Sequence, residues 1–133
     1  MRLFVDTAAW LALNDRNDQY HGEATSKADE IKKDRIELIT SEYILDEAIT
    51  LIRYRVSHRA AVTFGDSMLH SHIVKVLDLM EKDRLRAWEL FKRYDDKELS
   101  FTDCTSFLLM GNLKLKKVFT FDAHFRQVGF ELF

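Results

Sequence analysis

Short hydrophobic runs alternate with amphipathic stretches along the whole chain. Runs of mainly apolar residues predict buried strands at 2–6, 36–40, 73–77 and 118–121, with a possible edge strand at 130–133. Apolar positions at helical spacing predict helices at about 8–13, 19–33, 42–54, 58–70, 79–94 and 101–113. Strands separated by helices favour a parallel sheet with right-handed crossovers. We therefore expect a three-layer α/β/α sandwich around a central, mostly parallel sheet.

Polar residues mark the expected starts of several helices. Ser41 and Ser57 stand where N-cap residues are needed. Two capping boxes are also expected, one pairing Asp78 with Glu81 and one pairing Ser100 with Asp103.

Composition is consistent with one domain over residues 1–133. The chain is 47% hydrophobic with ten Phe, and four glycines without any proline leave no linker. A net charge of −2 is unlike the strongly basic surface of a dedicated nucleic-acid-binding protein. The single cysteine, Cys104, excludes an internal disulfide, fits a reducing compartment and is expected in the core. With no apolar run of membrane-spanning length and a strand at the N-terminus, we expect a cytoplasmic protein.

Two of the hydrophobic runs end abruptly in an aspartate. Asp6 follows the first predicted strand, and Asp122 follows the fourth. The carboxyl ends of parallel strands share one edge of the sheet, and ligands bind there in open α/β folds. Two carboxylates that are distant in sequence but close at this edge indicate a metal site.

Helix geometry selects a third acid, Glu47. At 100° per residue, the predicted helix 42–54 buries a stripe made of Ile44, Ala48, Leu51 and Ile52. Glu47 lies about 90° from the centre of that stripe, on its flank. The other acids of this helix point further toward solvent, so Glu47 is the one able to lean over the sheet edge.

The same argument selects Asp103 in a later helix. Cys104, Phe107, Leu108 and Gly111 mark the buried stripe, and Asp103 again lies on its flank. Asp103 also belongs to the first turn, where the helix dipole favours negative charge.

Four converging carboxylates would repel one another, and a divalent cation would relieve that repulsion. Mg²⁺ and Mn²⁺ prefer oxygen ligands, and a site of this kind orients a phosphodiester and lowers the pKa of a bound water. Each acid also has a structural explanation. Asp6 and Asp122 could cap the following helix, Asp103 could only pair with Ser100, and Glu47 could be a solvated surface acid.

Four segments resemble the PIN-domain family, most closely the VapC-type toxins of toxin–antitoxin pairs. They are VDTAAW at 5–10, TSEYILDE at 40–47, SFTDCTSF at 100–107 and TFDAHF at 120–125. The four acids of the family match Asp6, Glu47, Asp103 and Asp122. The resemblance implies a Mg²⁺- or Mn²⁺-dependent ribonuclease that cuts single-stranded RNA or RNA loops. It also implies a homodimer held inactive by a small cognate antitoxin protein.

One position departs from the family pattern. Ala8 stands where the family often has Ser or Asn, although the hydroxyl of Thr7 remains beside Asp6. Thr7 and Thr102 could orient a carboxylate or cap a helix, and the sequence leaves both roles open. His124, two residues after Asp122, is expected to stay outside the site.

Basic residues form two groups in the sequence. Arg53, Arg55 and Arg59 follow Glu47 along the chain, and Lys114, Lys116, Lys117 and Arg126 flank the fourth predicted strand. A solvated face is the simpler interpretation of both groups. If the acidic site exists, the arginines are a candidate phosphate-contacting rim.

Two other functions compete with the ribonuclease. A phosphatase with Asp6 as nucleophile would need a second Asp at position 8, where Ala8 stands. The other is a catalytically silent RNA-binding or regulatory module. A receiver-like switch would need acids clustered after the first strand and a Lys after a late strand, and that pattern is poorly met.

Overall fold

The computed structural model describes all 133 residues and contains five strands and seven helices. The strands are β1 (Arg2–Val5), β2 (Glu37–Ser41), β3 (Val74–Leu77), β4 (Lys117–Phe119) and β5 (Glu131–Leu132). The helices are α1 (Thr7–Asn14), α2 (His21–Lys33), α3 (Glu42–Arg55), α4 (His58–Leu69), α5 (Glu81–Arg93), α6 (Phe101–Asn112) and α7 (His124–Gln127).

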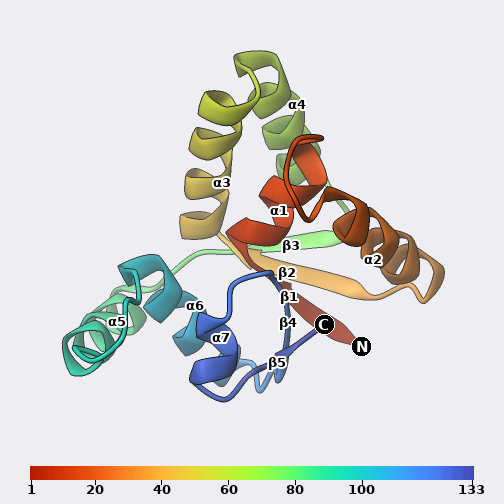
Figure 1. The fold of residues 1–133 in the computed structure, drawn as a ribbon. Helices are drawn as coiled ribbons and strands as arrows, with labels where there is room; N and C mark the ends of the chain where they lie inside the picture. The colour runs from red at the N-terminus through yellow and green to blue at the C-terminus, as the bar shows by residue number, and fades with distance from the viewer.

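The five strands form one parallel sheet in the order β3-β2-β1-β4-β5. At its centre, Phe4 of β1 pairs with Ile39 of β2 and with Val118 of β4. Helices α1 to α4 lie on one side of the sheet, and α5, α6 and α7 lie on the other (Figure 1). The predicted three-layer α/β/α sandwich is therefore confirmed, with every strand parallel.

The central strands are buried on both faces because helices cover both sides of the sheet. Leu3, Phe4 and Val5 are completely buried, as is Val118 on the neighbouring strand. They belong to one core cluster of 26 residues that reaches into most of the helices. Cys104 is buried in this cluster as a free thiol, as the sequence predicts. No helix in the structure combines the length and hydrophobicity that a bilayer crossing requires.

Three of the four predicted helix starts are confirmed. The hydroxyl groups of Ser41 and Ser57 accept backbone N–H bonds from the first turns of α3 and α4. Ser100 and Asp103 form a complete capping box at the start of α6.

The predicted capping box of Asp78 with Glu81 is wrong. The N-cap of α5 is Met80, which has an extended backbone, and the helix begins only at Glu81. The backbone N–H of Leu79 instead donates to Oε1 of Glu42 over 2.8 Å, and the Leu79 side chain is buried. This tertiary anchor holds the segment after β3 extended and so delays the helix.

Candidate metal centre

The centre of the sheet contains a topological switch point. The chain leaves β1 toward β2 and β3 on one side, and β4 and β5 lie on the other side. Crevices form outside the carboxyl ends of strands at such a point. Asp6 follows β1 directly, and its backbone N–H donates to the carbonyl of Phe119 at the end of β4 over 3.0 Å. The two strand ends that the sequence marks with aspartates are therefore neighbours.

The carboxyl group of Asp6 is almost fully enclosed, with only 4% of the residue exposed. The pKa of Asp6 is raised from 3.8 to about 7, mainly by burial and also by the negative charges of Asp103 and Asp122. Hydrogen bonds from the Thr120 hydroxyl and the Thr7 backbone oppose this rise. Asp6 is thus close enough to both other acids to feel their charge, as a shared site requires.

Thr120 links the two strand-end aspartates. Its buried hydroxyl donates to Oδ2 of Asp6 over 2.9 Å and accepts the backbone N–H of Asp122 over 3.0 Å. In the sequence, Thr120 stands within an apolar run that predicts a strand. A hydroxyl inside a run that should be fully buried is the signal that could have identified it, because a buried hydroxyl needs a partner.

Asp103 enters the site from the first turn of α6. Its Oδ2 accepts the backbone N–H of Ser100 over 3.1 Å, and its own N–H donates to the Ser100 hydroxyl. Burial raises the pKa of Asp103, and the charge of Asp122 raises it further. Asp103 is therefore both a capping residue and a candidate site residue, because the capping box fixes the carboxylate that faces Asp122.

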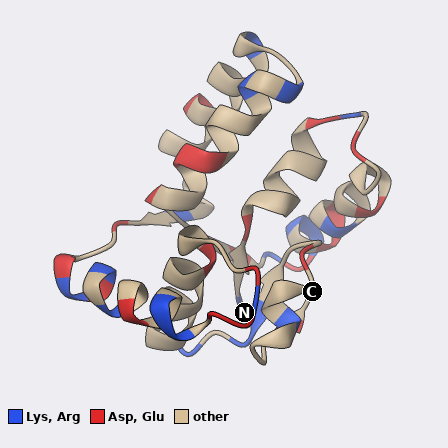
Figure 2. Cartoon of the chain, turned by 60° about the vertical axis from the view of Figure 1, so that its left-hand side comes forward, with Lys and Arg blue, Asp and Glu red and all other residues tan.

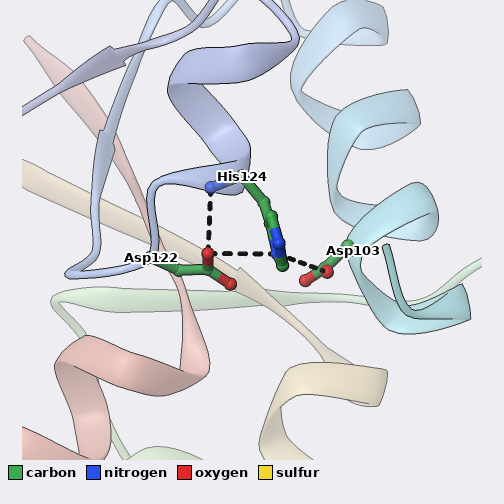
Figure 3. A group of neighbouring side chains, drawn as sticks. All are labelled: Asp103, Asp122 and His124. Atoms are coloured by element: carbon green, nitrogen blue, oxygen red, sulfur yellow. Dashed lines mark hydrogen bonds and ion pairs between the residues drawn. The ribbon is translucent and has the colours of Figure 1, made fainter. Parts of the chain in front are cut away.

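Contrary to expectation, the imidazole of His124 lies inside this site. Figure 3 shows the ring between Asp122 and Asp103, with Nδ1 3.1 Å from Oδ1 of Asp122 and 3.8 Å from Oδ2 of Asp103. One ligand atom from each of the three residues lies within 4.8 Å of the other two. The tight turn that carries the chain from Asp122 into α7 folds His124 back, and its backbone N–H also donates to Asp122 Oδ1.

Glu47 stands apart from this cluster. It is half-buried on α3 and makes no side-chain hydrogen bond or ion pair, and it is not among the three residues grouped around a common point. The structure thus brings together Asp6, Asp103 and Asp122 with His124, and Glu47 makes no hydrogen bond or ion pair with any of them.

Apart from Arg126, which is exposed on α7 two residues after His124, the basic residues singled out in the sequence lie away from the acids. Arg53, Arg55 and Arg59 are exposed around the turn between α3 and α4, and Arg53 is six residues, or about 9 Å along the helix, beyond Glu47. The amino end of β4 is surrounded by the three lysines singled out in the sequence, Lys114, Lys116 and Lys117. This end lies opposite the carboxyl edge where the acids meet. Charged residues of both signs are interspersed over the ribbon without one large basic face (Figure 2).

The donor set fits a hard divalent cation. Asp103 and Asp122 offer oxygens near one point, and the buried Asp6 adds a third carboxyl group, close enough for their charges to raise its pKa. Oxygen ligands and concentrated negative charge suit Mg²⁺ and Mn²⁺. Thr7 adds a buried hydroxyl without a hydrogen-bond partner directly beside Asp6, while the Thr102 hydroxyl makes no hydrogen bond within the protein.

Comparison with known proteins gives a consistent result. A sequence profile of the PIN domain matches residues 3–131. The chain is 37% identical over 128 residues to the 23S rRNA-specific endonuclease VapC20 of Mycobacterium tuberculosis, covering 96% of this chain and 95% of the relative. It is 28% identical over 129 residues to a VapC ribonuclease of Archaeoglobus fulgidus, covering 94% and 80% of the two chains.

Solved structures agree with the sequence relatives. The crystal structure of M. tuberculosis VapC20, described as a Sarcin-Ricin loop cleaving toxin, superposes with a TM-score of 0.88 at 33% identity over 97% of this chain and 96% of the other. VapBC2 from Rickettsia felis, bound to a DNA fragment from its promoter, gives a TM-score of 0.73 at 12% identity over 100% and 98% of the two chains. The second match supports the fold alone.

Proposed function

The chain belongs to the PIN-domain family, and we propose that it is a metal-dependent endoribonuclease that acts as the toxin of a toxin–antitoxin pair. The observation that carries this proposal is the meeting of Asp6, Asp103 and Asp122 at the switch point of the sheet. Three carboxylates from distant segments, one of them with a pKa of about 7, form a site that a cation would stabilise.

We assign the catalytic and metal-binding roles to Asp6, Glu47, Asp103 and Asp122. Asp103 and Asp122 would hold a Mg²⁺ or Mn²⁺ ion, and Asp6, oriented by the Thr120 hydroxyl, would add negative charge beside them. When bound, the ion supplies positive charge that activates water and offsets charge on the phosphodiester. Glu47 joins this set by family resemblance, and its unpaired carboxylate on α3 is free to accept a proton or a ligand contact.

The substrate we propose is an RNA loop. The relative that is 37% identical over nearly the whole chain is named for its action on 23S rRNA, and its structure is described as that of a toxin cleaving the Sarcin-Ricin loop. Ribosomal RNA is therefore the first substrate to test.

We propose that a cognate antitoxin docks in an apolar groove of about 710 Å³ beside α2 and α4. Trp10, Ile31 and Met68 are among its apolar lining residues, and Lys32 and Arg35 add positive charge. An amphipathic helix with apolar residues at helical spacing and a flanking acid would fit such a groove. The product of an adjacent short reading frame should suppress RNA cleavage by wild type. Weaker suppression of the Met68→Lys variant by the same protein would support this assignment.

We also propose that the chain forms a homodimer in the cytoplasm. Leu85 and Trp88 on α5 are 60% and 47% exposed, which leaves apolar surface available to a second copy. The single free cysteine suits a reducing compartment. Light scattering of the purified chain would test the dimer, and Trp88→Lys should shift it toward the monomer.

The ribonuclease is tested by cleavage of an RNA panel that includes 23S rRNA and an isolated Sarcin-Ricin loop. Wild type should cut with Mg²⁺ or Mn²⁺ and lose the activity in EDTA, and Asp6→Asn and Asp103→Asn should each abolish it. Asp29→Asn is the matched control, because Asp29 is exposed on α2 and remote from the acids. Equal cleavage by wild type and both site variants would mean that a contaminating nuclease is responsible.

A further inference from the structure

We propose that Nδ1 of His124 is a ligand of the divalent ion bound by Asp103 and Asp122, and that this nitrogen makes the site prefer Mn²⁺ to Mg²⁺. The inference rests on the proposed function, since it adds a ligand to the same metal site. It starts from the position of the ring, which sequence reasoning places outside the site.

The separation of the donor atoms fits a shared ion. Ligands bound at about 2.1 Å and at right angles around one octahedral ion are about 3 Å apart. Nδ1 of His124 and Oδ1 of Asp122 are 3.1 Å apart, which matches two neighbouring ligands. Oδ2 of Asp103 is 3.8 Å from the same nitrogen, between the values for neighbouring and opposite ligands. Small side-chain rotations would bring all three atoms onto one ion.

The orientation of the ring favours ligation over hydrogen bonding. Nδ1 is buried and has no hydrogen-bond partner, although a carboxylate oxygen is only 3.1 Å away. The 3.1 Å contact with the Asp122 oxygen is therefore an ion-pair distance and not a formed hydrogen bond. A buried ring nitrogen that lies between two carboxylates without a hydrogen-bond partner is suited to a cation shared by all three side chains.

The environment keeps the donors in place without the ion. Asp122 Oδ1 accepts the His124 backbone N–H over 2.9 Å, which fixes the turn that carries both side chains. Asp103 is fixed independently by its capping box with Ser100 on α6. The Asp103 carboxylate is thus fixed by α6 and the Asp122 carboxylate by the turn before α7, and the imidazole lies between two anchored groups.

A nitrogen ligand has a defined chemical consequence. Mg²⁺ strongly prefers oxygen donors, whereas imidazole binds transition metals, and Mn²⁺ accepts mixed oxygen and nitrogen sets. Replacing one oxygen by imidazole therefore disfavours Mg²⁺ more than Mn²⁺. Loss of the imidazole should lower the affinity for Mn²⁺ while changing the affinity for Mg²⁺ much less.

The test measures metal binding directly on the full chain. Wild type, His124→Ala, His124→Gln and the control His58→Gln are stripped with EDTA and titrated with Mn²⁺ and Mg²⁺ by calorimetry. His58 is exposed at the start of α4 and belongs to no acidic cluster. Pulsed electron paramagnetic resonance of Mn²⁺-loaded wild type, with and without ¹⁵N-histidine, then reports whether nitrogen is bound. The resonance measurement uses only wild-type protein, so it does not depend on whether a variant folds.

The expected result is a nitrogen coupling from one imidazole in wild type and in His58→Gln. Mn²⁺ affinity should fall by about tenfold or more in both His124 variants, with a smaller loss for Mg²⁺. A Mn²⁺ spectrum without nitrogen coupling, or an unchanged Mn²⁺ to Mg²⁺ affinity ratio in the His124 variants, would overturn the inference. If Asp103→Asn then still abolished Mn²⁺ binding, the proposed acidic site would stand. If wild type bound neither ion, both proposals would fail.

Discussion

Replacing Asp6 by Asn should stabilise the metal-free protein at neutral and alkaline pH. Asn has nearly the same shape as Asp, and its side-chain carbonyl can still accept the bond from the Thr120 hydroxyl. The substitution removes only the charge that burial, together with Asp103 and Asp122, disfavours. The same charge is what the proposed metal site needs, so stability and metal binding should change in opposite directions.

The size of the effect follows from the pKa of Asp6. The carboxyl group has a pKa of about 7 in the folded protein and an ordinary value of 3.8. Its neutral form is favoured by folding, so the stability it contributes is fully present below pH 3.8 and is lost as the pH rises to about 7. The full loss is about 4 kcal/mol, of which roughly 2 to 3 kcal/mol falls between pH 5 and 8.

The assay is urea unfolding in EDTA at several pH values from 5 to 8, followed by circular dichroism. The free energy of unfolding of Asp6→Asn relative to wild type should rise by roughly 2 to 3 kcal/mol across this range. The exposed Asp29→Asn should track wild type throughout. Adding Mn²⁺ at 100 times its Kd should restore about 2.7 kcal/mol to wild type at pH 8, and much less to Asp6→Asn.

Parallel stability profiles for wild type and Asp6→Asn would refute this reasoning. They would mean that Asp6 titrates at its ordinary pKa and that the three carboxylates do not share one low-dielectric site.

Three further outcomes follow from single side chains. Thr120→Val removes the hydroxyl that bonds both Asp6 and Asp122, so the free energy of unfolding should fall by about 1–3 kcal/mol and Mn²⁺ should bind more weakly. Urea unfolding and calorimetry measure these two effects, and Thr120→Ser should show neither. Ser57→Ala removes the N-cap of α4 and should lower the free energy of unfolding, measured in urea, by about 1 kcal/mol. RNA cleavage should not change, and a loss of cleavage would contradict the remote position of this cap. Burial raises the pKa of the Cys104 thiol to about 11. A disulfide reagent should therefore label one thiol per chain in urea and almost none in native buffer. Rapid labelling of the native protein would show instead that the thiol is accessible.

The strand ends are the part of the site that sequence determined best. A hydrophobic run followed by Asp identifies a buried strand and its carboxyl end, and all parallel strands present that end at the same edge. Asp6 and Asp122 could therefore be selected without coordinates. Asp103 was also accessible, because its capping box and its place on the flank of a helix are both local features.

Interactions between distant segments were not accessible in this way. Leu79 delays α5 because its N–H finds Glu42, 37 residues earlier in the chain. Thr120 reads as one residue of a strand, and only its contact with Asp6 across the two strands gives it a role. Glu47 satisfies the helix geometry, yet in the folded chain it makes no hydrogen bond or ion pair with the other acids.

The sequence by itself determined the element types, the layers and the edge of the sheet at which the acids gather. These features follow from hydrophobic periodicity and capping, which act over a few residues. Only the tertiary structure decided that β1 lies beside β4 and that His124 turns back between Asp103 and Asp122. Strand order and the path of a turn depend on how distant surfaces pack together, and no local pattern in the chain encodes those distances.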